Sequence, residues 1–163
     1  MAELRLKCGT TVLMDDEDLP RFAGLAWYID RKGYVARKTN VDKKPGRTVF
    51  MHRQVIGAVP GQLVDHVNGN PQDNRSANLR IATLQENGRN MRKRGGVSSQ
   101  FKGVTWSKSC GKWQAQIKIV NSKNAKYLGV FECEHEAGHA YNKAAVEYFG
   151  EFACLNPVGH SKD

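Results

Sequence analysis

The sequence lacks a long apolar run. No stretch approaches the roughly 20 residues that a helix needs to span a bilayer, so membrane insertion is not expected. The first ten residues contain no apolar segment typical of a secretion signal. The four cysteines form no C-x-x-C pair, so we expect reduced thiols rather than disulfides or a structural zinc site. A cytosolic protein fits these absences best.

Negative charge is in short supply. The chain of 163 residues has 25 lysines and arginines against 16 acidic residues, a net charge of +9. A surplus of this size favours a polyanionic partner, most often nucleic acid. The length allows one domain or two very small ones.

A basic run predicts where the chain divides. Residues 89–94 read RNMRKR, with four basic side chains in six positions, and residues 95–99 read GGVSS. A basic helix end followed by a Gly/Ser stretch is typical of a linker. We therefore predict a first domain over residues 1–94, a linker at 95–99 and a second domain over residues 100–158.

Short apolar runs separated by turn residues predict an α+β protein. Five strands are expected in the first domain, at residues 4–8, 10–14, 26–30, 33–39 and 47–51. Residues 15–25 predict a short helix whose first turn is acidic. The acidic residues 15–18 could bind a cation, but a solvated helix start is the preferred interpretation.

The second domain is expected to be a three-stranded antiparallel sheet with one helix packed across it. Its strands are predicted at residues 101–107, 112–120 and 125–131. The helix is predicted over residues 133–150, because apolar side chains recur at helical spacing. Those side chains are Ala137, Ala140, Tyr141, Ala144 and Tyr148.

Residues 135–139 read HEAGH, which fits the H-E-x-x-H pattern of zinc proteases. His135 and His139 fall opposite the apolar stripe of the predicted helix, where they face solvent. Only 24 residues follow His139 to supply a third ligand. A catalytic zinc site is therefore disfavoured.

A stronger candidate site lies in residues 63–90. Residues 62–67 and 79–82 predict two strands, and Thr83 to Glu86 has the T-x-x-E form of a capping box that begins a helix. Asp65 can hold Mg²⁺ or Mn²⁺, and Asn87 could offer its carbonyl oxygen to the same ion. His66 can accept a proton from water, and Asn78 can fix the intervening loop. These groups suit phosphodiester hydrolysis.

The neighbouring basic side chains have two interpretations each. His52 could touch the scissile phosphate or support the metal site, or it could be a packing histidine at the start of a helix. Arg53, Arg75 and Arg80 could contact phosphates or carry solvated charge. The clustering of residues 89–94 favours contact with the DNA backbone, made by Arg89, Arg92, Lys93 and Arg94.

M-H-R at 51–53, followed by V-D-H-x-N-G-N, D-N-R, N-L-R and a helical Asn, resembles the HNH (ββα-metal, His-Me finger) endonucleases, the homing enzymes of phages and introns above all. The resemblance covers roughly residues 10–94, with the ββα core at about 62–93. It implies that Asp65 and Asn87 bind the metal, that His66 is the general base and that Asn78 is the structural middle residue. Asn87 replaces the final histidine of the pattern, and Asn70 stands where many relatives have Asp.

Charge is segregated in the second domain. Residues 101–130 contain six lysines and no acidic residue, whereas residues 132–151 contain five glutamates and one lysine. In the middle strand Gln114, Gln116 and Lys118 share one face, and Trp113 and the alternate apolar residues share the other. The polar face is predicted to meet DNA, although an ordinary solvated face is the alternative.

The motifs S-S-Q-F-K-G-V-T-W, G-K-W-Q-A-Q-I, Y-L-G-V-F and E-A-G-H-A-Y-N-K-A-A resemble the AP2/ERF DNA-binding domain over residues 97–156. By that resemblance six side chains fall where the sheet meets DNA: Lys102, Thr105, Ser107, Gln116, Lys118 and Tyr127. Together the two resemblances imply a phage-type, metal-dependent DNA endonuclease or nickase that acts in the cytoplasm of a bacterial host. They imply double-stranded DNA as partner and a monomer rather than a dimer. The alternatives are a DNA-binding regulator with an inactive nuclease domain and an RNA-binding protein.

Overall fold

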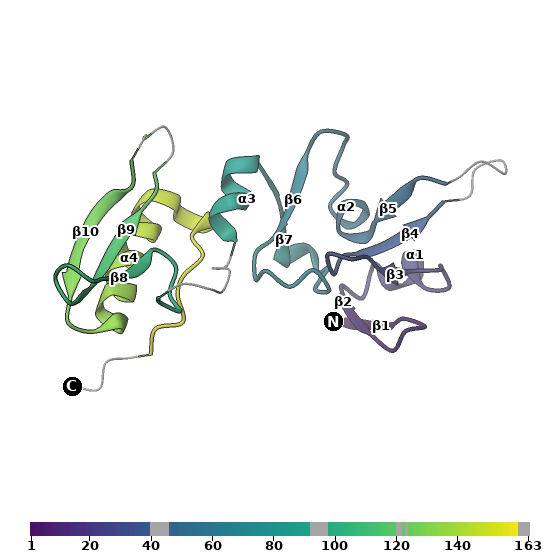
Figure 1. The fold of residues 1–163 in the computed structure, drawn as a ribbon. Coiled ribbons are helices and arrows are strands. Elements are labelled where there is room, and N and C mark those ends of the chain that lie inside the picture. The colour runs from purple at the N-terminus through teal and green to yellow at the C-terminus, as the bar shows by residue number, and fades with distance from the viewer. Residues whose placement is uncertain (40–45, 92–97, 120–121, 123, 160–163) are drawn as a thin grey trace. The chain divides into compact units, whose positions relative to one another are not determined.

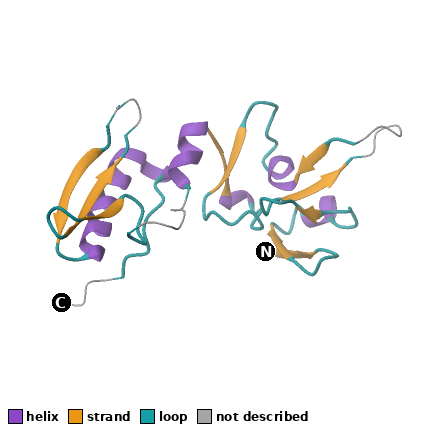
Figure 2. Cartoon of the chain, viewed as in Figure 1, coloured by secondary structure: helices purple, strands orange, loops and turns teal. Residues whose placement is uncertain are grey.

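A computed structural model gives the fold of residues 1–39, 46–91, 98–119, 122 and 124–159 (Figure 1). The chain forms two compact units, Met1–Asn87 and Gly88–Asp163. The domain limits expected from the sequence stay a prediction, because residues 95–97 of the proposed linker lie outside the described residues. Both units combine small antiparallel sheets with a few helices, which fits the expected α+β class (Figure 2).

The first unit begins with a hairpin and a small sheet. Strands β1 (Ala2–Arg5) and β2 (Thr11–Met14) pair antiparallel. Strands β3 (Tyr28–Ile29), β4 (Val35–Lys38) and β5 (Thr48–Phe50) form an antiparallel sheet in that order. All but β1 lie inside the predicted strands, and β1 begins two residues earlier than predicted.

The predicted helix over residues 15–25 is wrong in length. Helix α1 (Leu19–Phe22) has only four residues. Pro20 suits its first turn because a proline there gives up no helical hydrogen bond. Ala23 then leaves the helical region with ψ 142°, which ends the helix.

A single apolar cluster holds these elements together. Its buried members are Ala2, Leu6, Val12, Met14, Phe22, Trp27, Val35 and Met51. Met51 begins helix α2 (Met51–Val55), so this core fixes the start of α2 against the sheet. The next residue, His52, is buried with it.

A strand–loop–strand–helix unit follows. Strands β6 (Leu63–His66) and β7 (Leu79–Ala82) pair antiparallel, and the 3-10 turn η1 (Ser76–Asn78) precedes β7. Helix α3 (Leu84–Asn90) begins at the predicted capping box. Thr83 N–H donates to Glu86 Oε2 at 2.8 Å, and Glu86 N–H donates to Thr83 Oγ1 at 3.2 Å. Both halves of the capping box are therefore present.

The second unit is a three-stranded antiparallel sheet with one long helix. Strands β8 (Val104–Ser107), β9 (Lys112–Ile117) and β10 (Lys126–Phe131) lie in the order β10-β9-β8. Helix α4 (Glu134–Phe149) packs on this sheet and is followed by the turn η2 (Gly150–Phe152). The predicted meander and helix are confirmed, although β9 ends at Ile117.

The apolar stripe of α4 faces the sheet. Ala137, Tyr141 and Ala144 are buried, while Ala140 and Tyr148 are partly buried. Ala115 and Ile117 of β9 lie beneath them, fully buried. Within the described part of the chain, no helix is long and apolar enough to cross a membrane.

Candidate active site

Asp65 and His66 end strand β6, and both side chains are buried. The β-sheet register pairs Asp65 with Arg80 of β7. Arg80 donates to Asp65 Oδ2 from Nε at 3.0 Å and from Nη2 at 2.8 Å. The carboxylate is thus held in place by a cation from the neighbouring strand.

His66 is surrounded by aromatic rings. Its ring centroid lies 5.2 Å from that of His52 and 5.9 Å from that of Tyr34. Phe50 and Tyr34 in turn flank His52 at 5.6 and 5.2 Å. Burial lowers the pKa of His66, while Asn74 and then Asp65 act in the opposite direction. The imidazole is therefore neutral near pH 7 and able to accept a proton.

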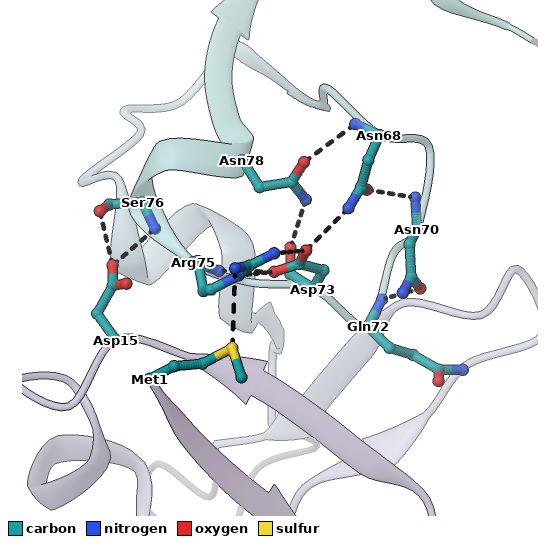
Figure 3. A network of polar contacts seen from close by, with 9 residues as sticks. All are labelled: Met1, Asp15, Asn68, Asn70, Gln72, Asp73, Arg75, Ser76 and Asn78. Carbon is teal, nitrogen blue, oxygen red and sulfur yellow. Dashed lines mark hydrogen bonds and ion pairs between the residues drawn. The ribbon is translucent and has the colours of Figure 1, made fainter.

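The loop between β6 and β7 is fixed by side-chain amides (Figure 3). Asn78 Oδ1 accepts the backbone N–H of Asn68 at 3.0 Å, and Asn78 Nδ2 donates to the carbonyl oxygen of Asp73 at 2.8 Å. Asn68 Nδ2 donates to Asp73 Oδ2 at 2.8 Å. Asn78 thus occupies the loop-fixing position expected of it.

Asp73 is the second buried carboxylate of the first unit's site. Arg75 donates to it from Nε at 2.7 Å and from Nη2 at 2.5 Å. These bonds, with the contribution of Asn68, lower the pKa of Asp73. The Arg75 guanidinium therefore binds within the loop, at the Asp73 carboxylate.

Asn87 lies on α3, where its side chain is partly buried. Asp65 and Asn87 offer one carboxylate and one amide, and Mg²⁺ binds through one or two carboxylates together with waters and substrate phosphates. This donor chemistry fits a magnesium-type ion. Among the described residues no group of three or more His, Cys, Asp and Glu side chains could hold a metal ion, so an ion at this site would depend on Asp65, Asn87, waters and substrate.

Burial of His52 gives a prediction for stability. Its pKa falls from 6.5 to about 4, with smaller contributions from His66 and Arg53. Between these two values the unfolded chain binds a proton that the folded chain excludes, so stability decreases as the pH falls through this window. This pKa shift can lower the free energy of unfolding by up to about 3 kcal/mol across that window.

We therefore expect His52→Gln to weaken the pH dependence of unfolding. Urea unfolding at about pH 7 and about pH 4.5 measures it, and the variant should lose less stability between them than the native chain. Equal losses in the two proteins would contradict the assignment.

Several predicted DNA contacts are engaged within the protein. Arg53 donates to the carbonyl oxygens of Gln62 and Val59 at 2.5 and 2.8 Å, which ties α2 to the following loop. Arg80 has 13% of its side chain exposed and pairs with Asp65. His52 is buried, so the structure favours the packing interpretation of this residue over direct contact with phosphate.

Arg89 and Lys102 are engaged in the second unit. The Arg89 guanidinium lies 5.0 Å from the ring centroid of Phe149. Lys102 Nζ donates to the carbonyl oxygens of Arg89 and Met91 at 2.5 and 2.7 Å, and burial lowers its pKa. Lys102 therefore binds carbonyl groups at the end of α3 and does not lie on the open face of the sheet. Arg92, Lys93 and Arg94 lie outside the described residues.

The other predicted sheet contacts gather on the face away from α4. The register pairs Thr105 with Gln114 and Gln116 with Tyr127, so these side chains share that face. Tyr127 is 58% exposed, and Lys118 beyond the end of β9 is also exposed. Ser107 is partly buried and its Oγ lies 3.0 Å from Ser109 Oγ. This face can present amide, hydroxyl and ammonium groups to a ligand.

The HEAGH histidines lie on the exposed side of α4, as predicted. The ring of His135 contacts Phe101 at 5.1 Å, and His139 Nε2 lies 3.3 Å from the carbonyl oxygen of Gly159. His135 Nδ1 also lies 3.9 Å from Cys133 Sγ, so the two histidines contact an aromatic ring, a thiol and a backbone group. The stretch is part of the outer surface of a supporting helix.

Sequence reasoning missed Tyr34, Phe50, Asp73 and Asn74 as parts of the site. Asn74 is fully buried and its amide acts on His66. The D-N-R motif was noted, but nothing local shows that its Asn faces a histidine eight positions earlier. Tyr34 directly precedes β4 and Phe50 ends β5, and both stand beside apolar residues, so they give no signal of a site.

The segment that carries this site is similar to a known protein family. Residues 49–89 match the HNH endonuclease family. The matched segment begins in β5, ends in α3 and includes all four proposed metal-binding and catalytic residues. The resemblance read from the sequence is confirmed for this part of the chain.

Three relatives extend the comparison. "Uncharacterized HNH endonuclease L560" of Acanthamoeba polyphaga mimivirus is 28% identical over 152 residues, 92% of this chain and 76% of that protein. "Protein 3.8" of Escherichia phage T7 is 34% identical over 76 residues, 46% of this chain. "APETALA2-like protein 2" of Oryza sativa subsp. indica is 45% identical over 51 residues, 31% of this chain. The chain spans 63% of the phage protein's length and 12% of the rice protein's.

The family match and the mimivirus relative together support a nuclease. The similarity to APETALA2-like proteins is partial, and the position of the AP2-like segment at residues 97–156 stays a prediction.

Proposed function

We propose that this protein is a metal-dependent DNA endonuclease that hydrolyses phosphodiester bonds. One observation carries the proposal: a buried, neutral imidazole, His66, directly follows a buried carboxylate, Asp65, inside the segment that matches HNH endonucleases. A neutral imidazole can take the proton of an attacking water near pH 7. A hard carboxylate beside it suits a divalent ion.

Each group of the site has a chemical task in this proposal. His66 accepts the proton of the water that attacks phosphorus, while the rings of Tyr34 and His52 limit its rotation. Asp65 and Asn87 would hold one Mg²⁺ or Mn²⁺ ion, and Arg80 keeps the Asp65 carboxylate oriented. Such an ion would supply positive charge to offset the negative charge that develops on the phosphate and the leaving 3′ oxygen. Asn78 keeps the loop after His66 in shape.

Site affinity is assigned to the second unit. We place the DNA-binding surface on the AP2-like sheet, at Thr105, Ser107, Gln114, Gln116, Lys118 and Tyr127. Side-chain amides can read base edges, and lysine contacts phosphates. We expect a monomer, and a monomer with one metal site would nick one strand of double-stranded DNA. The basic side chains Arg92, Lys93 and Arg94 are proposed to contact the DNA backbone.

The proposal is tested on supercoiled plasmid with the full chain in Mg²⁺ or Mn²⁺. Conversion to open circles that stops when EDTA is added supports it. Salt-dependent DNA binding without any cleavage, in either metal and on several DNA substrates, would instead favour a DNA-binding regulator with an inactive nuclease domain. Competition by duplex RNA shows whether RNA is the preferred ligand.

Lys118 gives a separate prediction for the sheet. Lys118→Ala should weaken binding to all DNA sequences alike and reduce the slope of log affinity against log salt by about 0.9, since one phosphate contact is lost. The measurement is fluorescence anisotropy of labelled duplex in a His66→Ala background, which prevents cleavage. Lys143→Ala, an exposed lysine on α4, is the matched control and should leave the slope unchanged. Equal slopes in all three proteins would remove Lys118 from the interface.

A further inference from the structure

The end of strand β2 lies alongside the loop that follows the active-site strand β6. Leu13 N–H donates to the carbonyl oxygen of Gln72 at 3.0 Å, and Asn74 N–H donates to the carbonyl oxygen of Leu13 at 2.8 Å. Leu13 and Asp73 thereby form a parallel β-bridge. The loop thus gains a strand partner about sixty residues earlier in the chain.

Asp15 adds a side-chain contact to this bridge (Figure 3). Its Oδ2 accepts the backbone N–H of Ser76 at 2.8 Å and the Ser76 hydroxyl at 2.6 Å. Ser76 begins the turn η1, so the carboxylate satisfies a backbone donor that such a turn leaves open. These two bonds lower the pKa of Asp15.

Asn74 belongs to the anchored part of the loop. Its own N–H binds Leu13, Ser76 two residues later binds Asp15, and Asn74 itself is fully buried. The Asn74 side chain raises the pKa of the His66 imidazole, against the effect of burial. At the other end of the loop, Gly69 N–H donates to the carbonyl oxygen of His66 at 2.8 Å.

We propose that Asp15 is a positioning residue for the nuclease site: through Ser76 and the β2–loop bridge, it fixes Asn74, and Asn74 holds the His66 imidazole. The inference rests on the proposed function of His66. It also gives the hairpin β1–β2 a role in catalysis, through the backbone contacts of Leu13 with Asp73 and Asn74. A general base must be held within a fraction of an ångström of its working position, since a misplacement of about 1 Å can cost about 10²-fold in rate.

The sequence offers a matched control at the next position. Asp16 belongs to the same acidic stretch, but it pairs with the N-terminal amino group at 2.5 Å and is exposed. Asp15→Ala and Asp16→Ala therefore remove the same chemical group one residue apart. Only the first removes a direct contact to the loop, since Asp16 reaches the loop through Met1, whose Sδ lies 3.8 Å from Arg75 Nη1 (Figure 3).

Two readouts test the proposal on the full chain. In plasmid nicking, Asp15→Ala should lower kcat about 10- to 100-fold with KM within about twofold, because the base is misplaced while the DNA-binding surfaces are kept. Ser76→Ala should have a smaller effect, and the double variant should match Asp15→Ala rather than add to it. Asp16→Ala should retain the native kcat.

The second readout needs neither metal nor DNA. Asp15→Ala should speed amide hydrogen exchange at Asn74 and Ser76 and should shift the ¹⁵N ring signals of His66 at fixed pH, whereas Asp16→Ala should change neither. Native exchange rates and native His66 signals in Asp15→Ala would overturn the proposal even if cleavage were slower. If the native protein cleaves no DNA, the proposed function fails, and these signals still decide whether Asp15 fixes the loop.

Discussion

Replacing His66 with alanine should lower the rate of DNA cleavage about 10²- to 10⁴-fold, the usual contribution of a general base. That loss corresponds to about 3 to 5 kcal/mol of transition-state stabilisation. The change should appear in kcat rather than in KM, because His66 is buried at the end of β6 and no DNA-binding surface depends on it. Single-turnover nicking of supercoiled plasmid in Mg²⁺ measures it.

His139→Ala is the matched control for this prediction. His139 is an exposed histidine of the HEAGH stretch on α4, and its removal should leave nicking at the native rate. A large loss in His139→Ala together with native activity in His66→Ala would contradict the assignment and move the chemistry to α4. Stoichiometric zinc that is lost with His139 would have the same meaning.

The second large effect concerns the folding of the second unit. Gly103 has φ +74°, and a Cβ at this position would lie 2.1 Å from Tyr141 Cδ2 and 2.5 Å from the carbonyl oxygen of Gln116. Gly103→Ala should therefore cost about 2 to 5 kcal/mol, from the left-handed backbone and from overpacking. Because Tyr141 is the buried anchor of α4, the helix and the sheet should separate together.

Gly111→Ala separates these two causes. Gly111 also has a positive φ, +61°, but a Cβ there would meet nothing within 4 Å. It should cost only about 1 to 2 kcal/mol. Tryptophan fluorescence during urea unfolding measures both variants in a Trp27→Phe background, where Trp106 and Trp113 of the second unit report alone. Equal losses in the two variants would contradict the predicted clash with Tyr141.

Much of the site unit is predictable because its signals are local. The strand at residues 79–82 and the capping box at Thr83 depend on neighbours within three or four positions, and both appear where the sequence placed them. The helix α4 follows from the spacing of small apolar residues along one face. The residue types Asp, His and Asn in this unit are sufficient to suggest hydrolysis of phosphodiester bonds.

The partners of individual cations were not predictable. The sequence left Arg80 open between a phosphate contact and a solvated charge, and the resemblance to the AP2/ERF domain placed Lys102 on the DNA-binding sheet. Their actual partners, a carboxylate across a strand pair and the carbonyl groups at the end of α3, become neighbours only through folding. Nothing in the local sequence shows whether a long cationic side chain pairs with a group of the protein or contacts DNA.

The acidic stretch at residues 15–18 illustrates the same limit. Its charges were assigned to a solvated helix start, yet Asp15, Asp16 and Asp18 each have a different partner: Ser76, the N-terminal amino group and Arg21. Two of these partners depend on the hairpin β1–β2 and on the loop before β7. The contact with the active-site loop was therefore beyond the reach of sequence patterns.

We propose that Asp65 and Asn87 hold one divalent ion beside His66. Anomalous diffraction from crystals of the protein grown with Mn²⁺ would locate that ion. We expect a single manganese peak within bonding distance of the Asp65 carboxylate and the Asn87 amide oxygen, and its loss in Asp65→Ala. A peak at any other set of side chains, or none in a preparation that nicks DNA with Mn²⁺, would contradict it.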